Sequence, residues 1–272
     1  MRDGTVRGLR GMKVRRSARP YLAVMWIAFA VMVACNVLFE ALRLGGTTSA
    51  EVSGAVFAWF TPAGYVFAIW GVIYVALFAW LAYCTLGEAR RAWHPAWNLA
   101  AVSVAFAVSC ALNVAWLVLF HLQLVAASMA VIVALWATVA VLYRAVRKGT
   151  FETWPVALGW MPVSLYAAWL TVAVVANASN LVTRMAGEGA PLAGAVSTLA
   201  LAAVVLLAGY FMRTRRADPV APLVFLWAVV GVGVHALDAS VPVAIGLFAL
   251  ATLAAFVTFA PAVITRALAQ AK

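Results

Sequence analysis

Charged residues are scarce in this sequence. Asp, Glu, Lys and Arg make up 10% of the 272 residues, whereas soluble proteins carry about 25%. Hydrophobic residues make up 67%, and the mean hydropathy is +1.03. A water-facing globule would lack the polar residues to cover so much apolar surface, which excludes soluble enzymes, nucleic-acid-binding modules and disordered linkers. Most of the surface must therefore face lipid.

Cysteine and acidic residues are also few. Cys35, Cys84 and Cys110 lie in apolar runs, and neither their odd number nor their spacing fits a disulfide, zinc or redox pattern, so we interpret them as small core residues. A lipoprotein signal ending at Cys35 is the alternative for the N-terminus, but the chain stays apolar through Phe39, which favours a membrane span. The 8 acidic residues face 19 basic ones, for a net charge of +11. In a membrane protein this excess reports topology and contact with anionic lipid, and it does not indicate a nucleic-acid partner.

Long hydrophobic runs dominate the chain. A helix rises about 1.5 Å per residue, so about 20 apolar residues cross a hydrocarbon core of about 30 Å. Eight stretches have this length, and they predict an all-α fold, a polytopic membrane helix bundle. The predicted spans are Pro20–Leu42, Gly64–Leu86, Ala96–Phe120, Leu124–Tyr143, Pro155–Leu181, Leu192–Met212, Val220–Leu237 and Pro242–Ile264.

The connections between these spans alternate in basic charge. One side holds Arg2, Arg7, Arg10, Lys13, Arg15, Arg16, Arg19, Arg90, Arg91, Arg144, Arg147, Lys148, Arg213, Arg215, Arg216, Arg266 and Lys272. The other side holds only Arg43 and Arg184, beside Glu40, Glu51, Glu188 and Asp238. The positive-inside rule therefore predicts cytoplasmic termini and a multi-pass protein of the cell inner (plasma) membrane.

The segment from Arg43 to Ala63 stands apart from the other, shorter loops. Glycines, threonines and serine in its first half are followed by apolar and aromatic residues that include Trp59 and Phe60. Such a loop is costly to leave in water, so we expect it to fold back over the mouth of the bundle as a lid. The alternative is that these aromatic residues form an ordinary interfacial belt.

Aromatic residues recur at helical spacing on three of the predicted spans. Steps of three and four place such residues on one face of a helix. The rows are Phe67, Trp70 and Tyr74; Asn113, Trp116 and Phe120; and Tyr166, Trp169, Ala173 and Asn177. Ordinary helix packing, with Asn bonding across a helix pair, is the alternative explanation of these rows. If they converge, they form a flat-walled pocket suited to a planar hydrophobic ligand.

Ionisable residues do not form a recognisable relay or catalytic group. Glu40, His121, His235 and Asp238 fall near the outer ends of the predicted spans, where they would either line a polar rim or be solvated helix ends. His121 has no second candidate at ligand spacing, so no metal site is predicted. No general acid, base or nucleophile arrangement is present, and we predict neither an enzyme nor an obligatory cofactor.

Three motifs resemble those of the tryptophan-rich sensory protein family, relatives of the mitochondrial translocator protein (peripheral benzodiazepine receptor). Pro62-Ala63-Gly64-Tyr65-Val66-Phe67, followed by Trp70 and Tyr74, is similar to the Pro-Pro-Gly-Trp-x-Phe signature that opens the second helix of the family. Leu112-Asn113 with Trp116 and Leu119-Phe120 resembles the third-helix pattern. Tyr166 to Trp169 with Ala173 and Asn177 resembles the fifth.

The resemblance implies a five-helix ligand-binding core over residues 20–182, after a basic tail at 1–19, with a cavity beneath the first loop. It implies a porphyrin, haem-like or other tetrapyrrole ligand, and a role as sensor, carrier or scavenger. The cavity wall would comprise Tyr65, Phe67, Trp70, Tyr74, Asn113, Trp116, Phe120, Tyr166, Trp169 and Asn177, with Trp59, Phe60 and Pro62 in the lid.

The sequence also departs from the family. Tyr65 replaces a tryptophan that is associated with porphyrin degradation in some members, and no tyrosine follows the fifth span, which removes the animal sterol motif. Residues 183–272 form a three-helix extension with no counterpart in the five-helix archetype. This extension is open to interpretation as a lipid-facing addition, a homodimer surface or a second module. An eight-helix secondary transporter of a small solute is the alternative function; it would need helices broken near Pro162 or Gly231 and Gly233.

Overall fold

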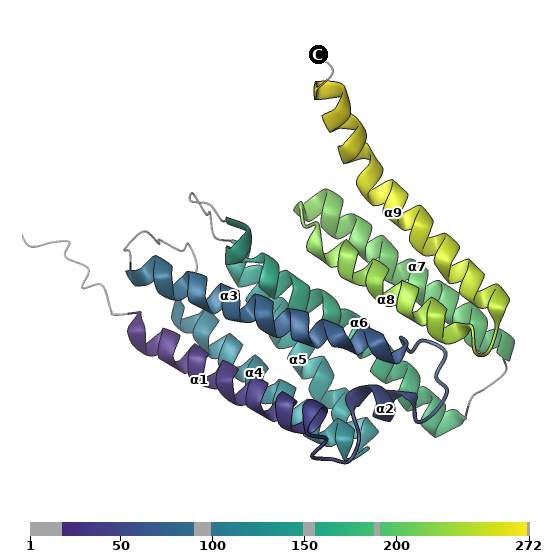
Figure 1. The fold of residues 1–272 in the computed structure, drawn as a ribbon, viewed down its shortest axis with the longest axis horizontal. Helices are drawn as coiled ribbons and strands as arrows, with labels where there is room; N and C mark the ends of the chain where they lie inside the picture. The colour runs from purple at the N-terminus through teal and green to yellow at the C-terminus, as the bar shows by residue number, and fades with distance from the viewer. Residues whose placement is uncertain (1–17, 90–98, 149–155, 188–190, 271–272) are drawn as a thin grey trace, which may run out of the picture.

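The computed structural model describes residues 18–89, 99–148, 156–187 and 191–270, and these are almost entirely helical (Figure 1). The basic tail up to residue 17, Arg90, Arg91, Glu188 and Lys272 lie outside the described residues. The long helices are α1 (Arg19–Asn36), α3 (Ile69–Ala89), α4 (Leu99–His121), α5 (Val125–Val146), α6 (Met161–Ala186), α7 (Pro191–Arg216), α8 (Val220–Ala236) and α9 (Val241–Gln270). Short elements are the π-helical turn η1 (Val37–Ala41), α2 (Ser49–Gly54), and the 3-10 turns η2 (Gly64–Ala68) and η3 (Val156–Gly159).

The predicted polytopic helix bundle is confirmed. Seven helices of the described chain are long and apolar enough to cross a membrane. The eighth, α8, has 17 residues, a length of about 25 Å. It packs between α6, α7 and α9, so it depends less on contact with lipid than the other helices do.

The fifth predicted span differs most from the helix observed. The helix begins at Met161 instead of Pro155, because η3 precedes it and Pro162 occupies its first turn, where the missing N–H costs nothing. It continues to Ala186 and ends at Gly187, whose φ of 78° is readily adopted by glycine. Neither Pro162 nor the pair Gly231 and Gly233, which lie within α8, breaks a helix.

The helices form two groups that meet along α6 and α8. In the first group α4 packs on α1 and α5, α5 packs on α6, and α3 packs on α1 and α6. In the second group α7, α8 and α9 contact one another, and α8 contacts α6 (Figure 1). Cys84 and Cys110 are buried and Cys35 is half-buried, and all three are free thiols, in line with the interpretation as core residues.

Basic residues gather at one end of the bundle. Successive spans alternate in direction (Figure 1), so the start of α1 and the ends of α5 and α7 lie at the same end. The described members of the basic set there include Arg19, Arg144, Arg147, Lys148, Arg213, Arg215 and Arg216. Arg43 and Arg184 lie at the other end, which we call the lid end because it carries residues 43–63.

A buried carboxylate joins the two helix groups at the basic end. Asp218, just before α8, is fully buried and accepts hydrogen bonds from the Tyr143 hydroxyl at 2.7 Å and the Ser164 hydroxyl at 2.6 Å. Its other oxygen accepts from the backbone N–H groups of Val220 and Ala221 at 2.9 and 3.3 Å. The carboxylate thus caps α8 and ties it to α5 and α6. Asp218 was not among the residues predicted from the sequence.

Candidate functional site

The three aromatic rows converge on the ring of Trp70. The ring centroid of Trp70 lies 5.8 Å from that of Trp116 on α4, and 6.1 and 6.2 Å from those of Tyr166 and Trp169 on α6. Within single rows, Trp70 stacks on Tyr74 at 5.9 Å, and Trp116 stacks on Phe120 at 5.3 Å. The rows therefore face one another, and lipid does not separate them.

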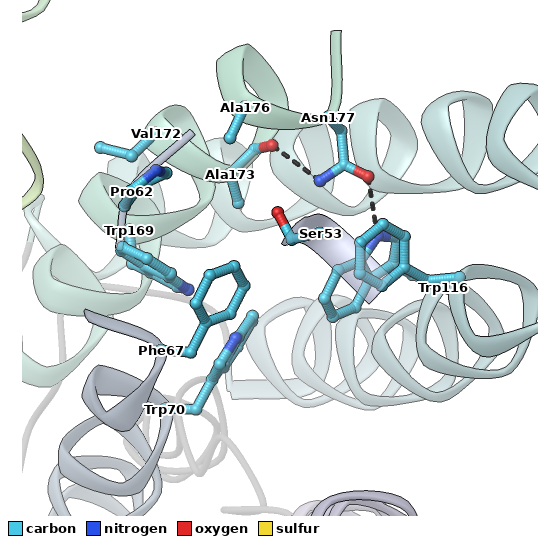
Figure 2. A pocket seen from close by; sticks show the side chains of 11 residues that line it. Ser53, Pro62, Phe67, Trp70, Trp116, Trp169, Val172, Ala173, Ala176 and Asn177 are labelled. Atoms are coloured by element: carbon cyan, nitrogen blue, oxygen red, sulfur yellow. Dashed lines mark hydrogen bonds between the residues drawn. The ribbon is translucent and has the colours of Figure 1, made fainter. Parts of the chain in front are cut away.

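A small cavity lies among these rings (Figure 2). Its volume is about 20 Å³, enough for about one water molecule. The lining residues are Ser53, Pro62, Phe67, Trp70, Trp116, Phe120, Trp169, Val172, Ala173, Ala176 and Asn177. The small side chains of Ala173 and Ala176 leave the open space on the α6 side, and Ser53 and Pro62 close it from the lid. The large pocket that the sequence suggested is therefore collapsed in this structure, because the rings pack on one another.

Residues 43–63 lie against the helices at the lid end, where Gly45 is next to His121 of α4 and Phe60 bonds to Ser179 of α6. They contain the short helix α2, which begins with a capping box: the Thr48 hydroxyl accepts from the Glu51 N–H at 3.3 Å, and the Glu51 carboxylate accepts from the Thr48 N–H at 2.8 Å. The spacing of Thr48 and Glu51 is the sequence signature of such a helix start, so α2 could have been found from the sequence.

Hydrogen bonds hold the lid to the helices beneath it. Asn180 on α6 donates to the carbonyl of Ser53 at 3.1 Å, and the N–H of Phe60 donates to the hydroxyl of Ser179 at 3.2 Å. On the other side, Glu40 in η1 accepts from the backbone N–H of Ser49 at 3.0 Å and also from its hydroxyl. The lid is thus attached to α6 and to the end of α1.

His121 lies beneath this attachment. Its side chain is 1% exposed, its Nδ1 donates to the carbonyl of Leu117 at 2.9 Å, and its Nε2 lies 3.8 Å from Glu40 Oε1. The lid residue Gly45 packs on the imidazole. From the sequence, His121 was expected either to line a polar rim or to be solvated at a helix end. Neither expectation fits, because the lid excludes water from its side chain.

Buried polar groups around the rings are only partly paired. Asn177 accepts a long hydrogen bond of 3.5 Å from the indole N–H of Trp116 and donates to the carbonyl of Ala173 at 2.9 Å. No hydrogen-bond partner among the described residues is found for the indole nitrogen of Trp169 or the hydroxyl of Tyr74. Figure 2 shows the Trp169 nitrogen turned toward the space between the lining residues.

Several expected wall residues lie elsewhere. Tyr65 is 48% exposed and packs edge-on against Trp227 of α8, with ring centroids 5.4 Å apart. Tyr74 and Tyr166 flank Trp70 without lining the cavity. Asn113 accepts a hydrogen bond from Asn36 of α1, a residue that was not predicted from the sequence.

The three predicted lid residues lie in different places. Pro62 lines the cavity, whereas Phe60 is buried and is not among the lining residues. Trp59 turns away toward α7, where its indole lies against Gly194. Ser53, Val172 and Ala176 line the cavity without having been predicted, since residues of this kind carry no aromatic or charged signal.

A family model described as TSPO-like protein matches residues 22–260. The chain belongs to this TSPO-like family. The match extends through α7, α8 and most of α9, so the three-helix extension belongs to the region that the family shares. No curated protein and no solved structure matches the chain. This TSPO-like chain is a multi-pass membrane protein of the TSPO type, as its spans and family together establish.

Proposed function

We propose that this TSPO-like protein binds a planar hydrophobic ligand, of porphyrin or other tetrapyrrole type, between α3, α4 and α6, and acts as a sensor, carrier or scavenger. The convergence of three aromatic rows beneath a lid carries the proposal. Flat ring faces supply dispersion and stacking contacts to a planar molecule. The basic end of the bundle would face the cytoplasm of a cell whose inner membrane holds the protein.

Polar groups around the rings support a ligand with acceptor atoms. The unpaired Trp169 N–H faces the cavity, and Asn177 is held in place by Ala173 and Trp116. A buried donor without a partner costs about 1–3 kcal/mol, and a ligand carbonyl, carboxylate or ring nitrogen would recover part of that cost. These few donors would orient the ligand, and the apolar walls would supply most of its affinity.

Binding requires the closed site to open. A cavity of about 20 Å³ is far below the range of about 300–1,000 Å³ for sites of drug-sized ligands. Ser53 and Pro62 come from the lid, and the lid is held by a handful of hydrogen bonds at Asn180, Ser179 and Glu40. Lifting this loop would free one side of the cavity and let the rings of Phe67 and Trp70 separate from those of Trp116 and Trp169.

Protoporphyrin IX titrated into purified protein tests the proposal through quenching of tryptophan fluorescence. We expect saturable quenching that weakens at least tenfold in affinity for Trp70→Ala and for Trp169→Ala. Trp136→Phe is the matched control, because Trp136 lies on α5, is 39% exposed and bonds to Thr171. Unsaturable quenching of the unmodified protein, or equal affinity in all three variants, would contradict binding in this cavity.

A further inference from the structure

A second, larger groove lies at the lid end, between the lid and the three-helix extension. Its volume is about 690 Å³, and it shares no lining residue with the aromatic cavity. Its walls come from the lid, the start of α7, the turn between α8 and α9, and the start of α9. The lining residues are Phe57, Trp59, Pro191, Leu192, Ala195, Asp238, Ala239, Ser240 and Val243.

The two aromatic walls of this groove are fixed in place. A Cβ at Gly194 would lie 2.2 Å from the indole nitrogen of Trp59, so the absence of a side chain there lets the indole rest on α7. The ring of Phe57 packs edge-on against Trp59 at 5.3 Å and stacks on His235 at 4.9 Å. Both rings are therefore held by α7 and α8 before any ligand arrives.

The charge of the groove favours a cation. Asp238 is exposed, and its carboxylate forms no hydrogen bond or ion pair within the described residues; the titratable side chain on which its charge acts is His235, near the end of α8. The starts of α7 and α9 each contribute about half a positive charge, and the end of α8 contributes about half a negative one. These helix ends sum to about half a positive charge, which the full negative charge of Asp238 outweighs. The net local charge is therefore negative, and this disfavours a phosphate or carboxylate ligand.

We propose that this groove binds an organic ammonium ion that carries an apolar body. The Asp238 carboxylate would pair with the cation, and the Trp59 indole would offer it an aromatic face. Leu192 and Val243 would contact the apolar body. This site uses residues of the extension and of the lid together, and it is independent of the ligand proposed for the aromatic cavity.

Calorimetric titration of the purified full-length protein in detergent with benzyltrimethylammonium tests the proposal. We expect saturable binding of this cation, weaker binding of benzyl alcohol and none of benzenesulfonate. Asp238→Asn should lower the affinity for the cation at least tenfold, and Trp59→Leu should also lower it. Asp238 is exposed, so its substitution leaves folding intact, which thermal unfolding of the variant verifies.

Glu51→Gln is the matched control, because Glu51 is a carboxylate at the same end of the bundle that is already paired with Arg43 at 2.8 Å. The Glu51→Gln variant should bind the cation with the same affinity as the unmodified protein. The proposal is overturned if the unmodified protein shows no saturable binding, if Asp238→Asn binds the cation as tightly, or if Glu51→Gln loses as much affinity as Asp238→Asn does.

Discussion

Asn36 on α1 donates a hydrogen bond of 2.9 Å to Oδ1 of Asn113 on α4, across 77 residues of sequence. Both side chains are buried, and Asn36 also donates to the carbonyl of Met32 at 2.8 Å. This contact joins α1 to α4, the helix that carries the lining residues Trp116 and Phe120. It is also the kind of polar contact that holds helices together where lipid removes the hydrophobic driving force.

Replacing Asn36 by Ala should therefore destabilise the bundle by about 1 kcal/mol, since Oδ1 of Asn113 loses its donor. Unfolding in a titration with sodium dodecyl sulfate measures the free energy. In the double variant Asn36→Ala/Asn113→Leu the second substitution should cost less than it does alone, because the pair is already broken. Strictly additive losses would show that the two residues are not coupled.

At Gly231, α8 contacts η2 and the end of the lid that precedes it. Its carbonyl accepts a hydrogen bond from the N–H of Ala63 at 3.0 Å, and a Cβ there would lie 2.2 Å from Cγ2 of Val66. Gly231→Ala should cost about 1–3 kcal/mol, and Val66→Ala should restore part of this loss. Gly71→Ala is the control, because a Cβ there meets nothing within 4 Å; a loss of stability from it equal to that of Gly231→Ala would contradict the steric explanation.

Asp218 should be the acidic residue on which stability depends most. In Asp218→Ala the hydroxyls of Tyr143 and Ser164 lose their acceptor, and α8 loses its cap, so we expect a loss of about 3 kcal/mol or more. The exposed Asp238 provides the comparison, since Asp238→Ala should change the free energy of unfolding by no more than about 0.5 kcal/mol. Similar losses from both substitutions would argue against a structural role for the buried carboxylate.

Asn180 should control how readily the lid opens. Its side chain donates to the carbonyl of Ser53 and accepts from Nε of Arg184 at 2.8 Å. Asn180→Ala removes both bonds, so amide hydrogen exchange in residues 47–63 should accelerate several-fold. Exchange in residues 135–146 of α5, toward the basic end of the bundle, should stay unchanged. If the lid amides exchange at the original rate, the lid is held by its apolar contacts instead.

Glu51 gives the lid helix a dependence on pH. The backbone N–H of Thr48, and secondly the Arg43 guanidinium, lower the pKa of this carboxyl below its ordinary value of 4.5. Because the folded pKa is depressed, the stabilisation of α2 is fully present above pH 4.5 and is lost as the pH falls through the lowered pKa. Carboxyl carbon NMR should report this pKa, and Arg43→Gln should raise it only part of the way, since the Thr48 bond remains. A complete return to the ordinary value would show that Arg43 is the main cause.

The sequence predicted much of the candidate site because its members share a helical spacing. Trp70, Trp116 and Trp169 lie on the faces that their steps of three and four indicated, and these faces meet. Tyr65 belongs to the same motif as Phe67, but it lies in the 3-10 turn η2, before the regular helix α3. Its ring therefore packs against Trp227. Asn36, Ser53 and Asp218 escaped prediction because each acts through partners at least 54 residues away, apart from local caps.

The amino-acid sequence alone determined that this chain crosses a membrane as a helix bundle, because runs of about 20 apolar residues have no other stable state in lipid. Tertiary structure alone decided which side of each helix faces inward. Val75 on α3 is 71% exposed and Leu77 is fully buried, although both are apolar. Where lipid is as apolar as the core, hydrophobicity does not distinguish the two sides, and the close fit of rings, glycines and paired amides sets the rotation of each helix and the size of the space between them.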